Sequence, residues 1–194
     1  MAEIQYAGEY IIDECILCTV GGLELNLKDQ VAAISIFEDI FKNSITGTIS
    51  FVDTNNLTAN ASIVGQEKLK LILVTPNAND KTDRTMAINF SDNPLHVFKV
   101  NSSGNVNDRT KVFSLSFTTN EMVRNNRIRV CQSYTGEPAK EIIKKVIRDP
   151  ELLDSKKEFY YEETTNLFKM IAPNMRPFDF INTVSRRCLS KEYK

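Results

Sequence analysis

The fold is decided by Val31–Pro76, VAAISIFEDIFKNSITGTISFVDTNNLTANASIVGQEKLKLILVTP. In Ile45–Phe51, apolar residues or glycine alternate strictly with threonine and serine. Side chains of a β-strand point alternately to its two faces, so a period of two predicts a half-buried strand. A second alternation follows, with leucine at 69, 71 and 73, and Pro76 ends it. The stretch therefore predicts two strands joined by a polar loop.

Alternation outside this stretch predicts further strands on both sides. They are expected at 10–20, 23–27, 31–40, 86–90, 95–100 and 113–117. Gly21-Gly22 is typical of a two-residue hairpin turn, and 101–109, rich in Asn, Ser and Gly, predicts a loop. About eight short strands separated by turns in the first two thirds of the chain indicate an antiparallel barrel or sandwich.

The hydrophobic period changes after residue 134. Thr135 is the expected N-cap of a helix with an apolar stripe, which ends at Asp149-Pro150. The stripe consists of Ala139, Ile142, Ile143, Val146 and Ile147. The other elements expected are short strands at 159–161 and 167–171 and a helix that begins at Pro177. The sequence predicts an α+β protein, mainly antiparallel β, and we expect its second domain to continue beyond Lys194.

Composition excludes several classes of protein. Hydrophobic residues make up 42% and charged residues 25%, which is typical of a globular domain. The net charge of −1 argues against a dedicated nucleic-acid binder. No apolar run is long enough to cross a membrane, and the first residues do not form a signal peptide, so we expect no membrane binding by this chain.

The sequence offers little chemistry. Cys15 and Cys18 have CxxC spacing, but on a strand their side chains point to opposite faces, which favours reduced thiols over a metal site. The single histidine, His96, lies within a predicted strand. The aromatic run Phe-Tyr-Tyr at 159–161 indicates core, with a sugar-binding platform as the alternative. Three arginines predict a solvated face or a subunit contact: Arg124, Arg127 and Arg129. We therefore expect no enzyme activity, no cofactor and no metal.

Several motifs in this order carry a resemblance to a known family. They are Phe37-Glu38-Asp39-Ile40, Thr46-Gly47-Thr48-Ile49, Asp53, Leu57, Ile63-Val64-Gly65-Gln66-Glu67 and, near the end, Pro173-Asn174-Met175-Arg176-Pro177-Phe178-Asp179-Phe180-Ile181. Their order and spacing resemble the baseplate central hub proteins of contractile-tailed, T-even-like phages, whose domains have a fold related to the tail tube. The motifs span most of the chain.

The resemblance implies a function and partners. Residues 1–132 would form a first tube-like β-barrel domain and 133–194 the beginning of a second. Three copies would form a pseudo-sixfold ring that adapts the sixfold tail tube to the threefold central spike and lets double-stranded DNA pass. The implied partners are the chain itself as a homotrimer, the tail tube protein, the central spike protein and inner baseplate proteins. The implied place is the tail baseplate of the virion, assembled in the host cytoplasm.

Two predicted strands have outer faces of small neutral polar residues: Thr46, Thr48, Ser50, Ser114, Ser116 and Thr118. If the resemblance holds, at least one of these faces points into the lumen; the alternative is an ordinary solvent face. Three other functions remain open. They are a tail-tube or tube-initiator protein in sixfold rings, a carbohydrate-active or cell-wall-degrading tail component, and a β-sandwich interaction module unrelated to phages.

Overall fold

The computed structural model describes residues 10–53, 61, 63–75, 87–107 and 110–191. The chain divides into two compact units, Met1–Asn120 and Glu121–Lys194. Residue 132, where the sequence-based boundary lies, falls within the first strand of the second unit.

The first unit is built around one antiparallel sheet. Its elements are β1 (Ile11–Cys18), β2 (Glu24–Asn26), the 3₁₀ helix η1 (Lys28–Gln30), β3 (Val31–Phe37), β4 (Thr46–Asp53), β5 (Lys68–Val74), β6 (Ala87–Asn89), β7 (Leu95–Asn107) and β8 (Thr110–Thr118). The strand order is β2-β1-β5-β7-β8-β4-β3, with β6 paired to β5. The described residues of this unit contain the eight antiparallel strands that the sequence predicts.

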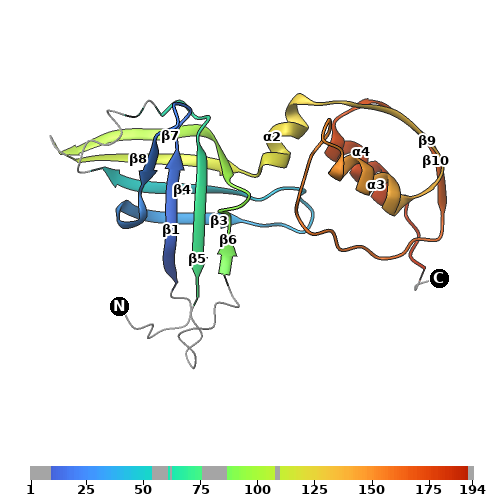
Figure 1. Cartoon of the computed structure of the whole chain (residues 1–194), viewed down its shortest axis with the longest axis horizontal. Helices are drawn as coiled ribbons and strands as arrows, with labels where there is room; N and C mark the ends of the chain where they lie inside the picture. The colour runs from blue at the N-terminus through green and yellow to red at the C-terminus, as the bar shows by residue number, and fades with distance from the viewer. Residues whose placement is uncertain (1–9, 54–60, 62, 76–86, 108–109, 192–194) are drawn as a thin grey trace. The chain divides into compact units, whose positions relative to one another are not determined.

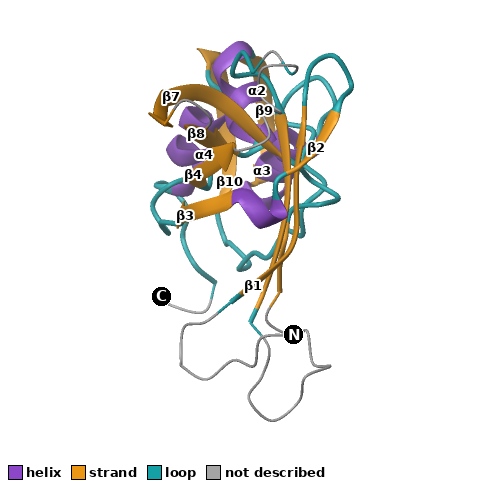
Figure 2. Ribbon diagram, turned by 90° about the vertical axis from the view of Figure 1, so that its left-hand side faces the viewer, coloured by secondary structure: helices purple, strands orange, loops and turns teal. Residues whose placement is uncertain are grey.

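The sheet curls into a half-barrel. β1 and β5 run across the direction of β3, β4, β7 and β8 (Figure 1), and the view turned by 90° shows β7 bending strongly (Figure 2). The two parts of the sheet are joined where β5 meets β7, through only two residue pairs, Lys68↔His96 and Leu69↔Leu95. A short pairing allows a sharp change of strand direction, which encloses one face of the sheet.

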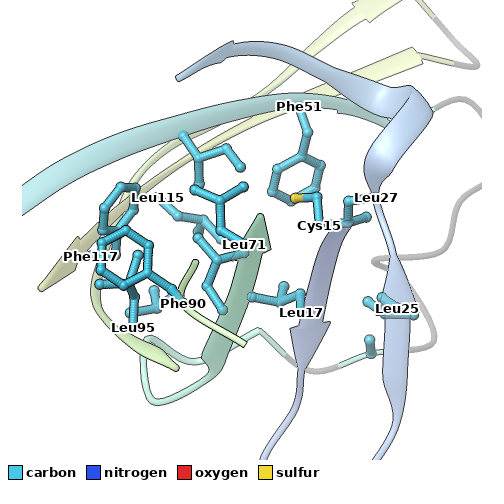
Figure 3. Close-up of a cluster of buried hydrophobic side chains, with 14 residues drawn as sticks. Cys15, Leu17, Leu25, Leu27, Phe51, Leu71, Phe90, Leu95, Leu115 and Phe117 are labelled. Carbon is cyan, nitrogen blue, oxygen red and sulfur yellow. The ribbon is translucent and has the colours of Figure 1, made fainter. Parts of the chain in front are cut away.

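That enclosed face holds the core of the first unit (Figure 3). In β4 every second residue is buried, beginning with Gly47 and continuing through Ile49 and Phe51, as the alternation predicts. The paired strand β8 adds Leu115 and Phe117, both fully buried. Gly47 has a packing reason: a Cβ there would lie 2.4 Å from Phe117 Cζ and 2.4 Å from the Ser35 carbonyl oxygen.

The first hairpin turn is centred one residue earlier than the expected Gly21-Gly22 turn. The Gly22 N–H donates to the Thr19 carbonyl at 3.0 Å, so Val20 and Gly21 are at the centre of the turn. Gly22 follows with φ +82°, a left-handed conformation that glycine adopts without strain. A tight turn followed by one left-handed residue matches the twist of the flanking strands.

The predicted loop at 101–109 is wrong over most of its length. β7 continues to Asn107 and pairs with β8 as far as Asn107↔Thr110. The pairing to β8 supplies the backbone hydrogen bonds that Asn, Ser and Gly do not favour by propensity, and it is interrupted by three register shifts.

The second unit packs helices on a two-stranded sheet. Its elements are α2 (Asn120–Arg127), β9 (Val130–Pro138), α3 (Ala139–Arg148), β10 (Leu167–Met175) and α4 (Pro177–Ser185). Strands β9 and β10 pair antiparallel. The buried residues of α3 are Ala139, Ile142 and Val146, members of the predicted stripe, and α4 begins at Pro177 as expected.

Two predictions in this unit are wrong. The helix expected after Thr135 is α3, which begins at Ala139, because Thr135 belongs to β9 and pairs with Lys169 of β10. Residues 159–161 form no strand, and Tyr160 is 85% exposed, so this run is not core. The described residues include no helix long and apolar enough to cross a membrane.

Candidate assembly surfaces

The six small polar residues singled out in the sequence lie on one surface. β4 and β8 are neighbours in exact register, with Thr46 opposite Thr118, Thr48 opposite Ser116 and Ser50 opposite Ser114. Cross-strand partners share a face, and this face is the one that points away from the core. We call these six residues the polar face.

Hydrogen bonds hold part of the polar face in place. Thr118 is only 4% exposed, and its hydroxyl donates to the Ile45 carbonyl at 3.1 Å. Asn101 Nδ2 donates to Ser116 Oγ at 2.8 Å. The neighbouring strand β7 places a positive charge beside the polar face, since Lys99 pairs with Ser116. Thr118 therefore contributes little open surface, whereas the other five residues are partly exposed.

A buried carboxylate fixes the loop that leads into β5. Glu67 is fully buried, and its carboxylate accepts the backbone N–H groups of Val64, Gly65 and Gln66 at 2.6, 2.9 and 3.0 Å. Gly65 has φ +86°, which allows the chain to turn around the carboxylate. The Gly-x-Glu spacing in the sequence is the signal that could have identified this turn and the role of Glu67 in it.

The outer side of the second unit's sheet is different in character. On β10, Leu167, Lys169 and Ile171 point away from the helices, and Leu167 and Ile171 are 69% and 70% exposed. Lys169 and Ile171 pair with Thr135 and Ser133 of β9. We call these five residues the β9–β10 face. The sequence pattern predicts a strand at 167–171 but does not show which of its faces is exposed.

The turn between β3 and β4 presents two large apolar side chains to water. Ile40 is 92% exposed and Phe41 is 91% exposed. The turn is ordered by Asp39, whose carbonyl accepts the Lys42 N–H at 2.9 Å and whose Oδ1 accepts the Phe41 N–H at 2.9 Å. We call Glu38–Lys42 the hairpin tip.

The described residues offer little for catalysis. They contain no group of three or more His, Cys, Asp or Glu side chains that could hold a metal ion. Cys15 and Cys18 are both free thiols, one buried and one half-buried, as expected for opposite faces of a strand. Burial, with the nearby charge of Glu14, raises the pKa of Cys15 to about 11, so this thiol stays protonated at neutral pH.

Of the three arginines, Arg127 and Arg129 are exposed, whereas Arg124 is engaged within the second unit. Arg124 Nε donates to the Leu152 carbonyl at 2.6 Å, and its Nη2 donates to the Pro150 carbonyl. Arg124 therefore closes the turn that follows α3. Arg129 donates to the Ile128 carbonyl at 2.8 Å.

Comparison with known proteins identifies the fold only through solved structures. No family model matches the chain, and no curated protein matches it. The tail protein from Neisseria meningitidis MC58 superposes with a TM-score of 0.54 at 10% identity, over 91% of this chain and 45% of that protein.

Two further structures show weaker likeness. One is an E. coli type VI secretion system component described as similar to the T4 bacteriophage tail proteins gp27 and gp5, with TM-score 0.48, 8% identity, and 91% and 39% of the two chains covered. The other is the Francisella PdpA–VgrG complex, with TM-score 0.49, 13% identity, and 92% and 26% covered. The chain spans less than half the length of each of these proteins. The likeness to the Neisseria protein confirms the predicted α+β class, and the chain has a tail-protein fold built on a curled half-barrel sheet.

Proposed function

We propose that this chain is a structural subunit of a phage baseplate central hub, in which three copies form a pseudo-sixfold ring around a channel for DNA. The first unit acts as the first tube-like domain and the second unit as part of a second one. The ring adapts a sixfold tail tube to a threefold central spike and contacts inner baseplate proteins. It is assembled in the host cytoplasm and carried in the virion, and the chain is not an enzyme.

The observation that carries this proposal is the polar face on a tail-protein fold. Two neighbouring strands carry six small hydroxyl side chains in register, five of them partly exposed, with no charge among the six. A wall rich in lysine would bind phosphates by releasing counterions and would retain the genome, whereas carboxylates would repel it. A neutral and hydrated wall does neither, which suits a channel that DNA must cross quickly.

The edges of the sheet support assembly into a ring. β3 is an edge strand of seven residues, and Val31–Phe37 contains no charged residue and no proline. The opposite edge, β2, has only three residues and carries Glu24. Proteins protect sheet edges with charges, prolines or short strands, so the unprotected β3 edge is open to pairing with another chain.

Native mass spectrometry of the full-length protein tests the proposal. Three copies are expected for a hub. Six copies would replace the proposal with a tail-tube or tube-initiator subunit, a reading favoured by the single half-barrel sheet in the described residues. A monomer at all concentrations would contradict both assemblies. Turnover of peptidoglycan by the purified protein would contradict the non-enzymatic role.

A further inference from the structure

The hairpin tip is unusual for an exposed turn. Turn positions favour Gly, Pro, Asn, Asp and Ser, because these residues adopt turn conformations or bond their own backbone. Here Ile40 and Phe41 occupy the centre of the turn, and both side chains are more than nine-tenths exposed. The two hydrogen bonds to Asp39 fix the turn before any partner arrives. A pre-ordered aromatic anchor loses little conformational freedom on binding, which favours a contact role.

The β9–β10 face is a matching surface within the same sequence. Leu167 and Ile171 flank Lys169 on β10, and their neighbours on β9 include the small residues Ser133 and Thr135. The inner side of this sheet is already covered by α3 and α4, with Phe168 and Ala172 buried against them. The outer side therefore has exposed apolar area that the described residues leave uncovered.

The charges of the two surfaces are complementary. The hairpin tip carries Glu38, Asp39 and Lys42, a net charge of −1. Lys169 is the only charged residue of the β9–β10 face and makes no ion pair within the described part of the chain. Opposite charges that meet across a contact fix its register and speed association.

We propose that the hairpin tip of one copy docks on the β9–β10 face of a second copy, with Phe41 and Ile40 packed on Leu167 and Ile171 and an acidic side chain of the tip paired with Lys169. Each copy has both surfaces, so the contact is head-to-tail. Such a contact produces a closed ring or an open filament, depending on the rotation between neighbours. The contact adds residues to the assembly proposed above, and it rests on that proposal only for closure into a ring.

Disulfide trapping between two differently sized copies tests the contact. One copy carries Ile40→Cys, the other carries Ile171→Cys and a mass tag, and both carry Cys131→Ser to remove the exposed native thiol on β9. Oxidation is expected to give a mixed dimer with about ten times the yield of a control in which Val20→Cys replaces Ile40→Cys. Val20 is a suitable control because it lies at another exposed hairpin turn, 64% exposed.

Charge reversal supplies a second measurement on the same copies. Lys169→Glu in the tagged copy is expected to lower the yield, and Glu38→Lys in the other copy is expected to restore it, while Asp39 is kept because its Oδ1 accepts the Phe41 N–H that orders the turn. Phe41→Ala is expected to weaken self-association by about 30-fold, the loss typical of an aromatic hot spot.

Three results would overturn the inference. The first is a mixed-dimer yield equal to that of the Val20→Cys control. The second is an intrachain disulfide in a dilute double variant with Ile40→Cys and Ile171→Cys, which would place the tip on its own chain. The third is a mixed-dimer yield that does not fall when Lys169→Glu is combined with the unchanged acidic tip. Native mass spectrometry separates this outcome from the proposed function: three copies without trapping would reject only the contact, and trapping in open filaments would reject only the ring.

Discussion

The two sheets of this chain each bury one face and expose the other, yet their exposed faces differ. The polar face of β4 and β8 consists of serine and threonine, and the pair Val52 and Val112 continues the same outer face beyond it. The β9–β10 face has two large aliphatic side chains on either side of a lysine. Both are outer faces of antiparallel strands, so neither secondary structure nor core packing requires the difference.

The difference indicates two separate demands on the surface. Short hydroxyl side chains keep a surface hydrated and neutral, and they leave little apolar area for a protein partner. Exposed Leu167 and Ile171 have the opposite property, since burying them against another surface removes apolar area from water. The proposed function would turn the polar face toward solvent and DNA, and the proposed contact between copies would use the β9–β10 face.

The largest effect is expected at Gly47, which lies on the buried side of β4, the strand that carries half of the polar face. In Gly47→Val the new side chain would overlap Phe117 and the Ser35 carbonyl, and the carbonyl belongs to the backbone of β3 and cannot move cheaply. We expect a loss of about 3 kcal/mol in the free energy of unfolding, measured by urea denaturation. Gly104→Ala is the control, because a Cβ there meets nothing within 4 Å. Equal stability of the two variants would show that Gly47 has no packing role.

The next largest effect is expected from the buried thiol of Cys15, with the exposed thiol of Cys131 as the comparison. Cys15 is fully buried in the first unit, whereas Cys131 is exposed on β9. Burial raises the pKa of Cys15 from 9.0 to about 11, so its contribution to stability is present below pH 9 and is lost as the pH rises through 11. Between these two pH values the free energy of unfolding should fall by roughly 1.4 kcal/mol per pH unit, and Cys15→Ala should remove this pH dependence.

Thiol labelling checks the same pair of residues at constant pH. A maleimide at pH 8 is expected to modify Cys131 within minutes and Cys15 only when the first unit unfolds. Rapid labelling of Cys15 in the native protein would contradict the packing of the core around β1.

A smaller effect is expected from one added charge on the polar face. Thr48→Arg should leave assembly intact, slow genome ejection, and raise the salt slope of DNA binding by the ring by about 0.9 for the added phosphate contact. Val20→Arg, at an exposed turn of the same unit, should change neither the ejection rate nor the salt slope. If both variants eject DNA at the same rate, or if an assembled structure has the polar face turned away from the channel, the assignment of this face is wrong.

The smallest effect is expected on the β9–β10 face. Ile171→Thr keeps a good strand former and removes apolar surface that is 70% exposed, so the stability of the dilute protein should change by no more than about 0.5 kcal/mol. Urea denaturation at low protein concentration measures it. A loss well above that figure would show that Ile171 packs within its own chain, which would remove the contrast between the two faces.

The parts of the fold that could be predicted are those where large apolar residues alternate. In β4 and β8 the inner residues Ile49, Phe51, Leu115 and Phe117 set the period, so the presence of both strands and the alternation of their two faces followed directly, whereas β8 begins at Thr110, earlier than expected. The second half of β7 could not be predicted, because its register is set by β8 and not by its own residues. Thr135 has the properties of an N-cap, but pairing with β10 outweighs that local preference.

The assembly surfaces were only half predictable. Alternation shows that a strand has two faces but not which one is buried when both carry apolar residues, as in β10, where Phe168 points inward and Ile171 outward. Helix α2 has few apolar residues, and it is anchored by a distant partner: Asn125 Oδ1 accepts the Phe178 N–H at the start of α4 at 2.8 Å. Such contacts between residues far apart in sequence leave no local pattern.

The Glu67 turn has a consequence for the local dynamics of the first unit. The N–H groups of Val64, Gly65 and Gln66 lie outside any strand or helix, where amide hydrogens usually exchange with solvent within seconds. All three are held by one buried carboxylate, which releases them only if the carboxylate leaves the interior. Their exchange with deuterium should therefore be as slow as that of β5, making this short irregular segment part of the unit's most protected region.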